Sequence, residues 1–239
     1  MSLRNSVTIV ASPRPRVGKT LLARMLVDFH LQESRAALGF DLNAGDGTLA
    51  QFLPEYATIA AIGDVNGQMA LFDRLIADDG VAKVVDLGNE SFASFFELAG
   101  QIGLVEEASK HGIVIVIMFM LTPDASSVEA YGSLGKRFPN AMLVPAHNEI
   151  LGPAQHRGKY PIGSGALTVR LPLLAPGLRK YIARPPFSFA DAQLAANSDV
   201  PVDIRIELKH WQRRVFIEFR ELVLRVLLAD LRISMRTGS

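Results

Sequence analysis

Residues 7–20 read VTIVASPRPRVGKT, and this stretch decides the fold. It opens with apolar and β-branched residues, a pattern typical of a strand that is buried on both faces. A short loop with two prolines and two arginines follows. The residues from Gly18 to Gln32 then have the spacing of an amphipathic helix, with apolar side chains at Leu21, Leu22, Met25, Leu26 and Phe29. The stretch therefore predicts a strand, a loop and a helix, the repeating unit of an α/β sheet.

The same alternation continues along the chain. Apolar runs predict strands at Val7–Ala11, Ala37–Leu42, Val81–Asp86, Ile113–Leu121, Ala141–Pro145 and Ala166–Leu171. Helical patterns lie between them at Gly18–Gln32, about Asn66–Asp78, Phe92–Lys110, Ala125–Phe138 and Gly177–Ala183. This order predicts a doubly wound α/β fold with a mostly parallel sheet. We expect a single domain over residues 1–239, with its core at about 5–185.

A long helix is expected at the C-terminal end, at about residues 203–231. Its apolar side chains recur at spacings of three or four and share one face: Ile204, Leu208, Trp211, Val215, Phe219, Leu222 and Val226. Basic residues dominate the other positions, and a basic amphipathic helix can lie on a membrane surface. Acidic residues are interspersed and weaken attraction to anionic lipid. We therefore favour packing on the body of the protein or on a partner, with membrane contact as the alternative.

The composition excludes several classes of site. The chain has 239 residues, no cysteine and a formal net charge of +1. Without cysteine there are no disulfides or thiolate metal sites, and a reducing cytoplasm is the expected compartment, since no signal-peptide pattern precedes the first strand. The five histidines show no metal-ligand spacing, so a zinc site is not expected. The near-neutral charge gives no strong case for nucleic acid.

The loop after the first strand has the chemistry of a phosphate site. Its end, Gly18-Lys19-Thr20, matches the Walker A pattern G-x-x-x-x-G-K-[ST], whereas Pro13 stands at the first glycine. Backbone N–H groups and the helix N-terminus would form an anion cradle. Lys19 would reach the terminal phosphates, and the Thr20 hydroxyl would bind Mg²⁺. The predicted nucleotide contacts are Arg16, Val17, Gly18, Lys19, Thr20 and Leu21.

Two prolines stiffen this loop. Pro13 and Pro15 lack a backbone N–H and fix φ near −65°, so a positive φ at residue 15 is excluded. The N–H groups of residues 16–20 remain available at the helix entrance, where the helix dipole is strongest. Arg14 and Arg16 add two guanidinium groups, which favour bidentate phosphate contacts.

The loop resembles that of the ParA/MinD family of deviant Walker A ATPases, which reads K-G-G-x-G-K-[ST]. The corresponding residues 14–20 read RPRVGKT. Arg14 stands where the family carries its signature lysine, which reaches across a dimer interface to the partner's nucleotide. The resemblance thus implies catalytic roles for Arg14 and Lys19, and a nucleotide-dependent homodimer.

The second strand also resembles the family, whose corresponding strand ends in D-x-D. Asp41 matches the first aspartate, which implies a catalytic role in organising Mg²⁺, and Asn43 stands at the second, which positions the attacking water. An amide cannot accept a proton as a carboxylate does. Asp46 is a possible substitute, although residues 46–48 are better interpreted as a turn followed by a helix cap.

Two later strands complete the resemblance. Residues 81–86 resemble a Walker B strand that ends in Asp86, whose carboxylate would orient the magnesium shell. Asn148 follows the strand whose terminal asparagine contacts the base in the family. The resemblance therefore implies ATP and Mg²⁺ as cofactors, with Thr20, Asp41 and Asp86 around the metal and Asn148 at the nucleotide.

The expected function is that of a nucleotide-binding switch. Such a protein binds ATP–Mg²⁺, hydrolyses it slowly and positions, partitions or assembles a cargo complex, such as plasmids, septum components or secretion and cellulose-synthesis machinery. Pro13, Pro15 and Asn43 together favour the main alternative, a pseudo-ATPase that serves as a protein-interaction scaffold. A third possibility is a small-molecule kinase or ligase of the dethiobiotin-synthetase type, whose loop also ends in V-G-K-T.

Overall fold

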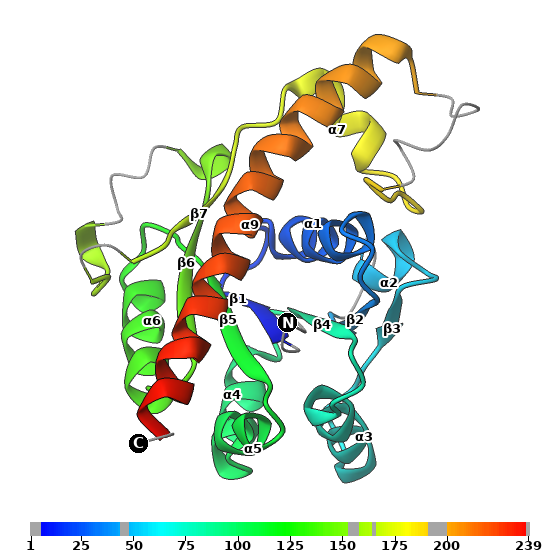
Figure 1. Cartoon of the computed structure of the whole chain (residues 1–239). Coiled ribbons are helices and arrows are strands. Elements are labelled where there is room, and N and C mark those ends of the chain that lie inside the picture. The colour runs from blue at the N-terminus through cyan, green and yellow to red at the C-terminus, as the bar shows by residue number, and fades with distance from the viewer. Residues whose placement is uncertain (1–5, 44–47, 153–157, 164–165, 191–199, 238–239) are drawn as a thin grey trace.

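The computed structural model describes residues 6–43, 48–152, 158–163, 166–190 and 200–237, with side chains as far as residue 228. A seven-stranded sheet forms the centre, with the order β3-β2-β4-β1-β5-β6-β7 (Figure 1). Every neighbouring pair is parallel. The strands are β1 Ser6–Ala11, β2 Ala37–Leu42, β3 Ala57–Ile59, β4 Ala82–Leu87, β5 Val114–Met120, β6 Met142–Asn148 and β7 Val169–Leu171. The predicted α/β fold is confirmed, and its sheet is parallel throughout.

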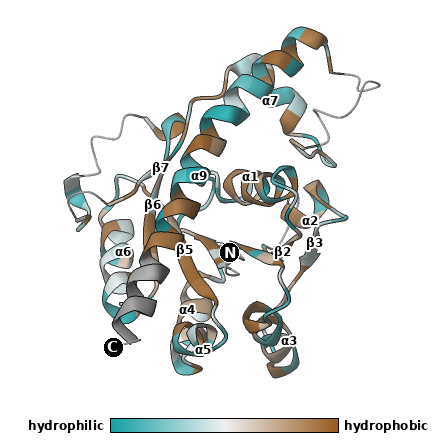
Figure 2. Cartoon of the chain, viewed as in Figure 1, coloured by the Kyte–Doolittle hydropathy of each residue, from teal (hydrophilic) through white to brown (hydrophobic). Residues whose placement is uncertain are grey.

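Helices cover both faces of the sheet. They are α1 Lys19–Gln32, α2 Leu49–Phe52, α3 Val65–Ile76, α4 Phe92–Gln101, α5 Leu104–Lys110, α6 Ala125–Arg137, the 3₁₀ turn η1 Glu149–Leu151, α7 Pro176–Ile182 and α9 Val202–Thr237. One apolar core joins the sheet to α1, α2, α7 and α9. A second core joins it to α3, α4, α5 and α6 on the opposite face. This layering is visible in Figure 1, and Figure 2 shows the brown, apolar strands between the two layers.

Three sequence predictions differ from the structure. The single helix expected at Phe92–Lys110 was wrong, because Gly103 takes a left-handed φ of 62° and divides it into α4 and α5. The strand expected at Ala166–Leu171 begins only at Val169. The short strand β3 was missed, because it is too short to show a periodic pattern. The helix cap expected at residues 46–48 is confirmed at Thr48, the N-cap of α2, although the extent of that helix was not predicted.

The long C-terminal helix packs on the body of the protein, as the sequence predicts. The predicted apolar face is buried through its middle, and Val215 and Phe219 are both fully inaccessible to solvent. The Phe29 ring of α1 meets Phe219 edge-on at 5.5 Å between ring centroids. The indole N–H of Trp211 donates to the Pro172 carbonyl at 2.9 Å. Within the described residues, no helix has the length and apolar character needed to cross a membrane.

Two buried charges of α1 hold the chain that leads toward α9. The Arg24 guanidinium donates to the Ile182 carbonyl at 3.0 Å and lies 3.6 Å over the Phe52 ring. Asp28, one turn further, is fully buried and accepts from the Ser188 hydroxyl and the Phe189 N–H, both at 2.7 Å. These contacts fix the segment from Ile182 to Phe189, the connector, against α1.

Asp28→Ala is expected to destabilise the protein by about 3 kcal/mol, because it leaves a buried N–H unpaired and removes the charge that compensates Arg24. Chemical unfolding measures the change. Glu33→Ala is the matched control, since Glu33 also joins α1 to the C-terminal region but pairs with the exposed Arg220 at 2.7 Å. This exposed pair should contribute under about 1 kcal/mol. Equal losses in both variants would contradict the assignment of Asp28 as the buried anchor.

Candidate functional site

The predicted site residues gather where three neighbouring strands end. In the sheet, Asp86 of β4 is level with Val10 of β1 on one side and with Asp41 of β2 on the other. The loop that follows β1 therefore begins beside both aspartates. Ligands in parallel α/β sheets bind at this carboxyl edge of the strands.

The loop between β1 and α1 has left-handed backbone at two positions, in spite of its two prolines. Arg16 has φ 57° and Gly18 has φ 97°, so the positive φ values fall at residues that follow the prolines and not at Pro15. Arg16 corresponds to a glycine of the family pattern. A non-glycine residue in this region costs about 1–2 kcal/mol, which the surrounding loop must offset. The loop thus holds its curved shape with Gly18 alone, without the two glycines of the family pattern that Pro15 and Arg16 replace.

Helix α1 begins at the end of this loop with an open first turn. Gly18 is the N-cap and offers no side chain to the N–H groups that follow. The N–H groups of Lys19, Thr20 and Leu21 have no partner within an α-helix by geometry, and together with the helix dipole they favour an anion. Leu21 itself packs its side chain against the core, so its contribution to a ligand would come from its backbone.

Lys19 and Thr20 point in toward the sheet. The Lys19 ammonium donates to the Arg14 carbonyl at 2.8 Å, and the residue as a whole is 6% exposed. Burial lowers its pKa, and the charge of Asp86 opposes that shift. The Thr20 hydroxyl donates to Asp86 Oδ2 at 2.7 Å. The loop lysine and the loop threonine therefore both lie beside the Walker B-like aspartate.

Asp86 is the most perturbed carboxyl of the site. Burial raises its pKa to about 7, and the neighbouring Asp41 adds to the shift, while Thr20 and Lys19 oppose it. Its Oδ1 atom is buried and has no hydrogen-bond partner among the described residues. A buried carboxylate oxygen without a partner is costly, and a cation removes that cost.

Asp41 is engaged differently from what the family resemblance implies. Its Oδ2 accepts from the Ala50 N–H of α2 at 2.8 Å, and its Oδ1 accepts from the N–H and the side-chain amide of Asn43, both at 3.0 Å. The Asn43 amide also donates to the Asp86 carbonyl at 3.1 Å. Asn43 therefore ties the end of β2 to the end of β4. Asp46 lies outside the described residues.

Arg14 is bound within its own chain. Its guanidinium donates to Asp124 Oδ1 at 2.6 and 2.9 Å, and to the Ser126 hydroxyl at 2.7 Å. Asp124 is also the N-cap of α6, where it accepts from the Ser127 N–H. The guanidinium lowers the pKa of the Asp124 carboxyl strongly. Arg16, by contrast, extends from the loop with an exposed side chain.

Asn148, the last residue of β6, supports the loop through a hydrogen bond to its backbone. Its amide donates to the Val17 carbonyl at 3.1 Å, and its Oδ1 accepts from the Ile150 N–H. A Cβ added at Gly18 would lie 2.5 Å from the Asn148 amide nitrogen. The glycine is therefore required here by the close approach of Asn148 as well as by its positive φ. The described Asn148 side chain is 6% exposed and holds the loop in place.

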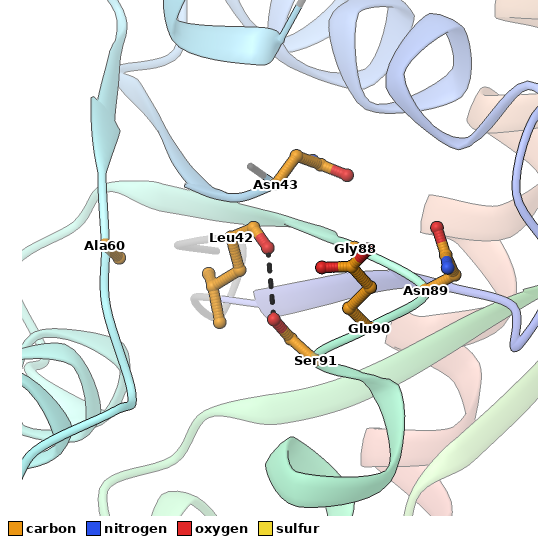
Figure 3. A pocket seen from close by; sticks show the side chains of 7 residues that line it. All are labelled: Leu42, Asn43, Ala60, Gly88, Asn89, Glu90 and Ser91. Carbon is orange, nitrogen blue, oxygen red and sulfur yellow. Dashed lines mark hydrogen bonds between the residues drawn. The ribbon is translucent and has the colours of Figure 1, made fainter. Parts of the chain in front are cut away.

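A polar pocket of about 210 Å³ lies next to this cluster, and the sequence analysis missed it (Figure 3). It is lined by Leu42, Asn43, Ala60, Gly88, Asn89, Glu90 and Ser91. Figure 3 shows the Glu90 carboxylate extending into it, with the Ser91 hydroxyl bonded to the Leu42 carbonyl at 3.3 Å. The signal that could have found it is the sequence GNE at residues 88–90, directly after the buried strand β4 ends at Leu87.

The donors present suit Mg²⁺ at one position. The Thr20 hydroxyl and the partnerless Asp86 Oδ1 are hard oxygen donors of the kind that Mg²⁺ prefers. Asp41 fits less directly, because both of its oxygens already accept hydrogen bonds. Among the described residues, no group of three or more His, Asp or Glu side chains forms a metal cage. The site fits a cation shared with phosphate oxygens and water, which is the usual arrangement for Mg²⁺.

Comparison with known proteins adds the following. No protein-family model matches the chain, and no curated protein matches it significantly in sequence. Among solved structures, the MinD cell division protein of Aquifex aeolicus is 15% identical, with a TM-score of 0.43 over 88% of this chain and 96% of the other. The same organism's MinC:MinD complex gives 16% identity and a TM-score of 0.44, over 88% and 94% of the chains. A nucleotide-binding protein from Archaeoglobus fulgidus in complex with ADP gives 13% identity and 0.41, over 89% and 90%.

The raised pKa of Asp86 predicts a pH-dependent stability. The folded protein keeps the proton up to about pH 7, whereas the unfolded chain releases it near pH 4, so this group makes the metal-free protein less stable as pH rises from 4 through 7. Asp86→Asn removes the buried charge and keeps an acceptor for Thr20. It should stabilise the protein by a few kcal/mol at pH 8 and hardly at pH 4, measured by chemical unfolding without Mg²⁺. An equal effect at both pH values would contradict the shift.

Arg16→Gly tests the loop backbone. Glycine adopts φ 57° without steric cost. The free energy of unfolding of the variant should therefore be about 1 kcal/mol higher than that of the unmodified protein. Gly80→Ala is the reverse control, since Gly80 also has a positive φ, at 75°, with open space around it. That variant should lose about 1 kcal/mol. Destabilisation by Arg16→Gly would show that the arginine side chain stabilises the loop by more than its backbone costs.

Proposed function

We propose that this protein is a ParA/MinD-like switch that binds ATP–Mg²⁺ and hydrolyses it slowly. One observation carries the proposal: a buried carboxylate oxygen without a partner, Asp86 Oδ1, lies beside the Thr20 hydroxyl at the uncapped start of α1. A cation bound between these two oxygens and a phosphate would give Asp86 Oδ1 a partner and would neutralise charge on the phosphate. The motif resemblance of the loop, of Asp41 and of Asp86 supports the same assignment.

Each residue has a role in this proposal. The N–H groups of residues 16–21 bind the phosphates, and Lys19 neutralises their charge with the two ammonium protons that the Arg14 carbonyl does not use. Thr20 and Asp86 hold the metal, which when bound would neutralise charge on the phosphate oxygens. Asp41 acts through Asn43 and the start of α2, which it positions. Asn148 fixes the loop through its bond to the Val17 carbonyl, in place of a direct contact with the base of the nucleotide.

Arg14 connects the site to a possible dimer. In the proposed switch, nucleotide binding draws Arg14 from Asp124 to a phosphate, either in its own chain or in a second copy. ATP would then hold two copies together at the faces that carry Arg14, and hydrolysis would release this contact. A cargo or partner protein would be held by one of these two states.

The residue that would activate water is the part of the family pattern that this site lacks. Asn43 cannot accept a proton, and its amide is committed to Asp41 and Asp86. Glu90 is the carboxylate that the adjacent pocket offers in its place. These contacts also favour the second candidate, a pseudo-ATPase scaffold, because Asn43 serves the structure of the strand ends.

Calorimetric titration with ATP and Mg²⁺ tests the binding half. The unmodified protein should bind, and Lys19→Ala should weaken binding at least tenfold, because it removes the buried ammonium. Lys110→Ala is the matched control, since Lys110 is exposed and pairs with Glu107 on the surface. Its affinity should be unchanged. Absence of binding at millimolar ATP in the unmodified protein would overturn the switch and leave the scaffold.

Steady-state phosphate release tests the catalytic half. Asn43→Asp places a carboxylate at the position where the family carries one, and turnover should rise at least tenfold. The variant also removes the donor to Asp41 and to the Asp86 carbonyl, so turnover is compared at saturating ATP. Glu90→Gln should lower turnover if Glu90 receives the proton of the attacking water. If neither variant changes turnover, both residues are structural. If turnover requires an added metabolite, the small-molecule kinase or ligase becomes the better assignment.

A further inference from the structure

The outer face of α9 carries a stripe of exposed apolar side chains. Ile217 is 62% exposed, Leu224 55% and Ile206 52%. Leu228 and Val202 extend the stripe at its two ends, at 47% and 62%. The successive spacings of 4, 11, 7 and 4 residues are close to whole turns of a helix, so all five lie on one side. This side is opposite the face that packs on α1 and β7, and Figure 1 shows α9 as the outermost element there.

Part of the stripe is symmetric about Ile217. Ile206 and Leu228 lie eleven residues before and after it, so they form an apolar pair, and Leu224 is level with His210, seven residues on the other side. If two copies of the helix lie antiparallel with Ile217 on the axis, Ile206 of each copy meets Leu228 of the other, whereas Val202 lies beyond this contact. A surface that complements itself in this way is what a two-fold interface requires.

The charges beside the stripe are also complementary. Glu221 lies four residues after Ile217, while Arg213 and Arg214 lie four and three residues before it. In the antiparallel arrangement, Glu221 of each copy is level with Arg214 of the other and lies on the same flank of Ile217, whereas Arg213 lies on the opposite flank. Glu221 also pairs with Arg225 of its own helix at 3.0 Å. The helix dipoles also oppose each other favourably in this orientation. The stripe therefore specifies a partner helix of the same sequence running in the opposite direction.

We propose that the outer face of α9 binds the same face of a second copy of this chain, antiparallel, with Ile217 on the two-fold axis. A membrane surface suits the stripe less well, because Arg213 and Glu221 both lie within about 40° of its centre line and would enter the apolar layer with it. Glu221 instead finds a partner, Arg214, in a second copy.

This interface is independent of the proposed nucleotide switch. The stripe faces away from α1 and its phosphate loop, so the α9 dimer should form without ATP. Lys19→Ala should dimerise as the unmodified protein does. A chain that lost its nucleotide affinity would keep the α9 dimer, and a chain with a disrupted stripe would keep its nucleotide affinity, which separates the two proposals.

Cysteine cross-linking tests the register, because the chain has no cysteine of its own. Ile217→Cys places two thiols at the axis and should give disulfide-linked dimer within minutes of mild oxidation. Ile59→Cys is the matched control, since Ile59 is 75% exposed on β3 and should link at least tenfold more slowly. Ile206→Cys and Leu228→Cys should each link poorly alone and readily when mixed. Equal rates for Ile217→Cys and Ile59→Cys would overturn the interface, and strong self-linking of Ile206→Cys would overturn the antiparallel direction.

Sedimentation velocity and vesicle flotation provide an independent readout. The unmodified protein should sediment as a dimer without nucleotide at tens of micromolar, and Ile217→Glu should be monomeric because it places two carboxylates together at the axis. Val65→Glu, an exposed apolar position on α3, should remain dimeric. A monomer that floats with vesicles containing phosphatidylserine, and loses this binding in Ile217→Glu, would overturn the dimer in favour of a membrane surface. A monomer that does not float would also overturn it.

Discussion

The burial of α1 between two layers is the constraint on which the site depends. The sheet covers one side of this helix, and α9 with the connector near residue 188 covers the other. Arg24 and Asp28 carry opposite charges on successive turns of the buried helix, and their contacts fix its position. Because the loop ends at the first residue of α1, this packing also fixes where Lys19 and Thr20 lie. The position of the site therefore depends on residues of α9 and of the segment near residue 188, which are far from the loop in the sequence.

The sequence predicted the residues that meet at the strand ends better than it predicted what they do there. Asp41 and Asp86 each close an apolar run, and parallel strands bring such ends together, so their proximity follows from the pattern. The pattern could not show that Asn43 would bond to both strands, because that depends on side-chain geometry. Nor could it show that Arg16 would take the left-handed conformation, since an arginine there contradicts its own backbone preference. The break at Gly103 was missed because the apolar period continues through it.

In the proposed switch, phosphate binding and water activation depend on different parts of the site. The loop has a curved backbone, an uncapped helix start and a buried ammonium, all of which would act on a bound anion. The residue at the position that would act on water, Asn43, instead joins two strands. Arg14, the residue proposed to reach a phosphate, joins the loop to the start of α6. In this arrangement a bound nucleotide would be held by rigid groups and would change the protein mainly by freeing or recruiting Arg14.

The contact between Phe29 and the aromatic residues of α9 has a consequence for the order of folding during synthesis. Phe29 is translated early, whereas Phe216 and Phe219, which cover it, emerge about 200 residues later. At ribosomal rates of roughly 5–20 residues per second, the outer side of α1 stays uncovered for about 10–40 s. The nascent chain would present an apolar helix face throughout that time. A chaperone that binds nascent apolar segments would therefore have its longest opportunity at α1, and release would coincide with the arrival of the final helix.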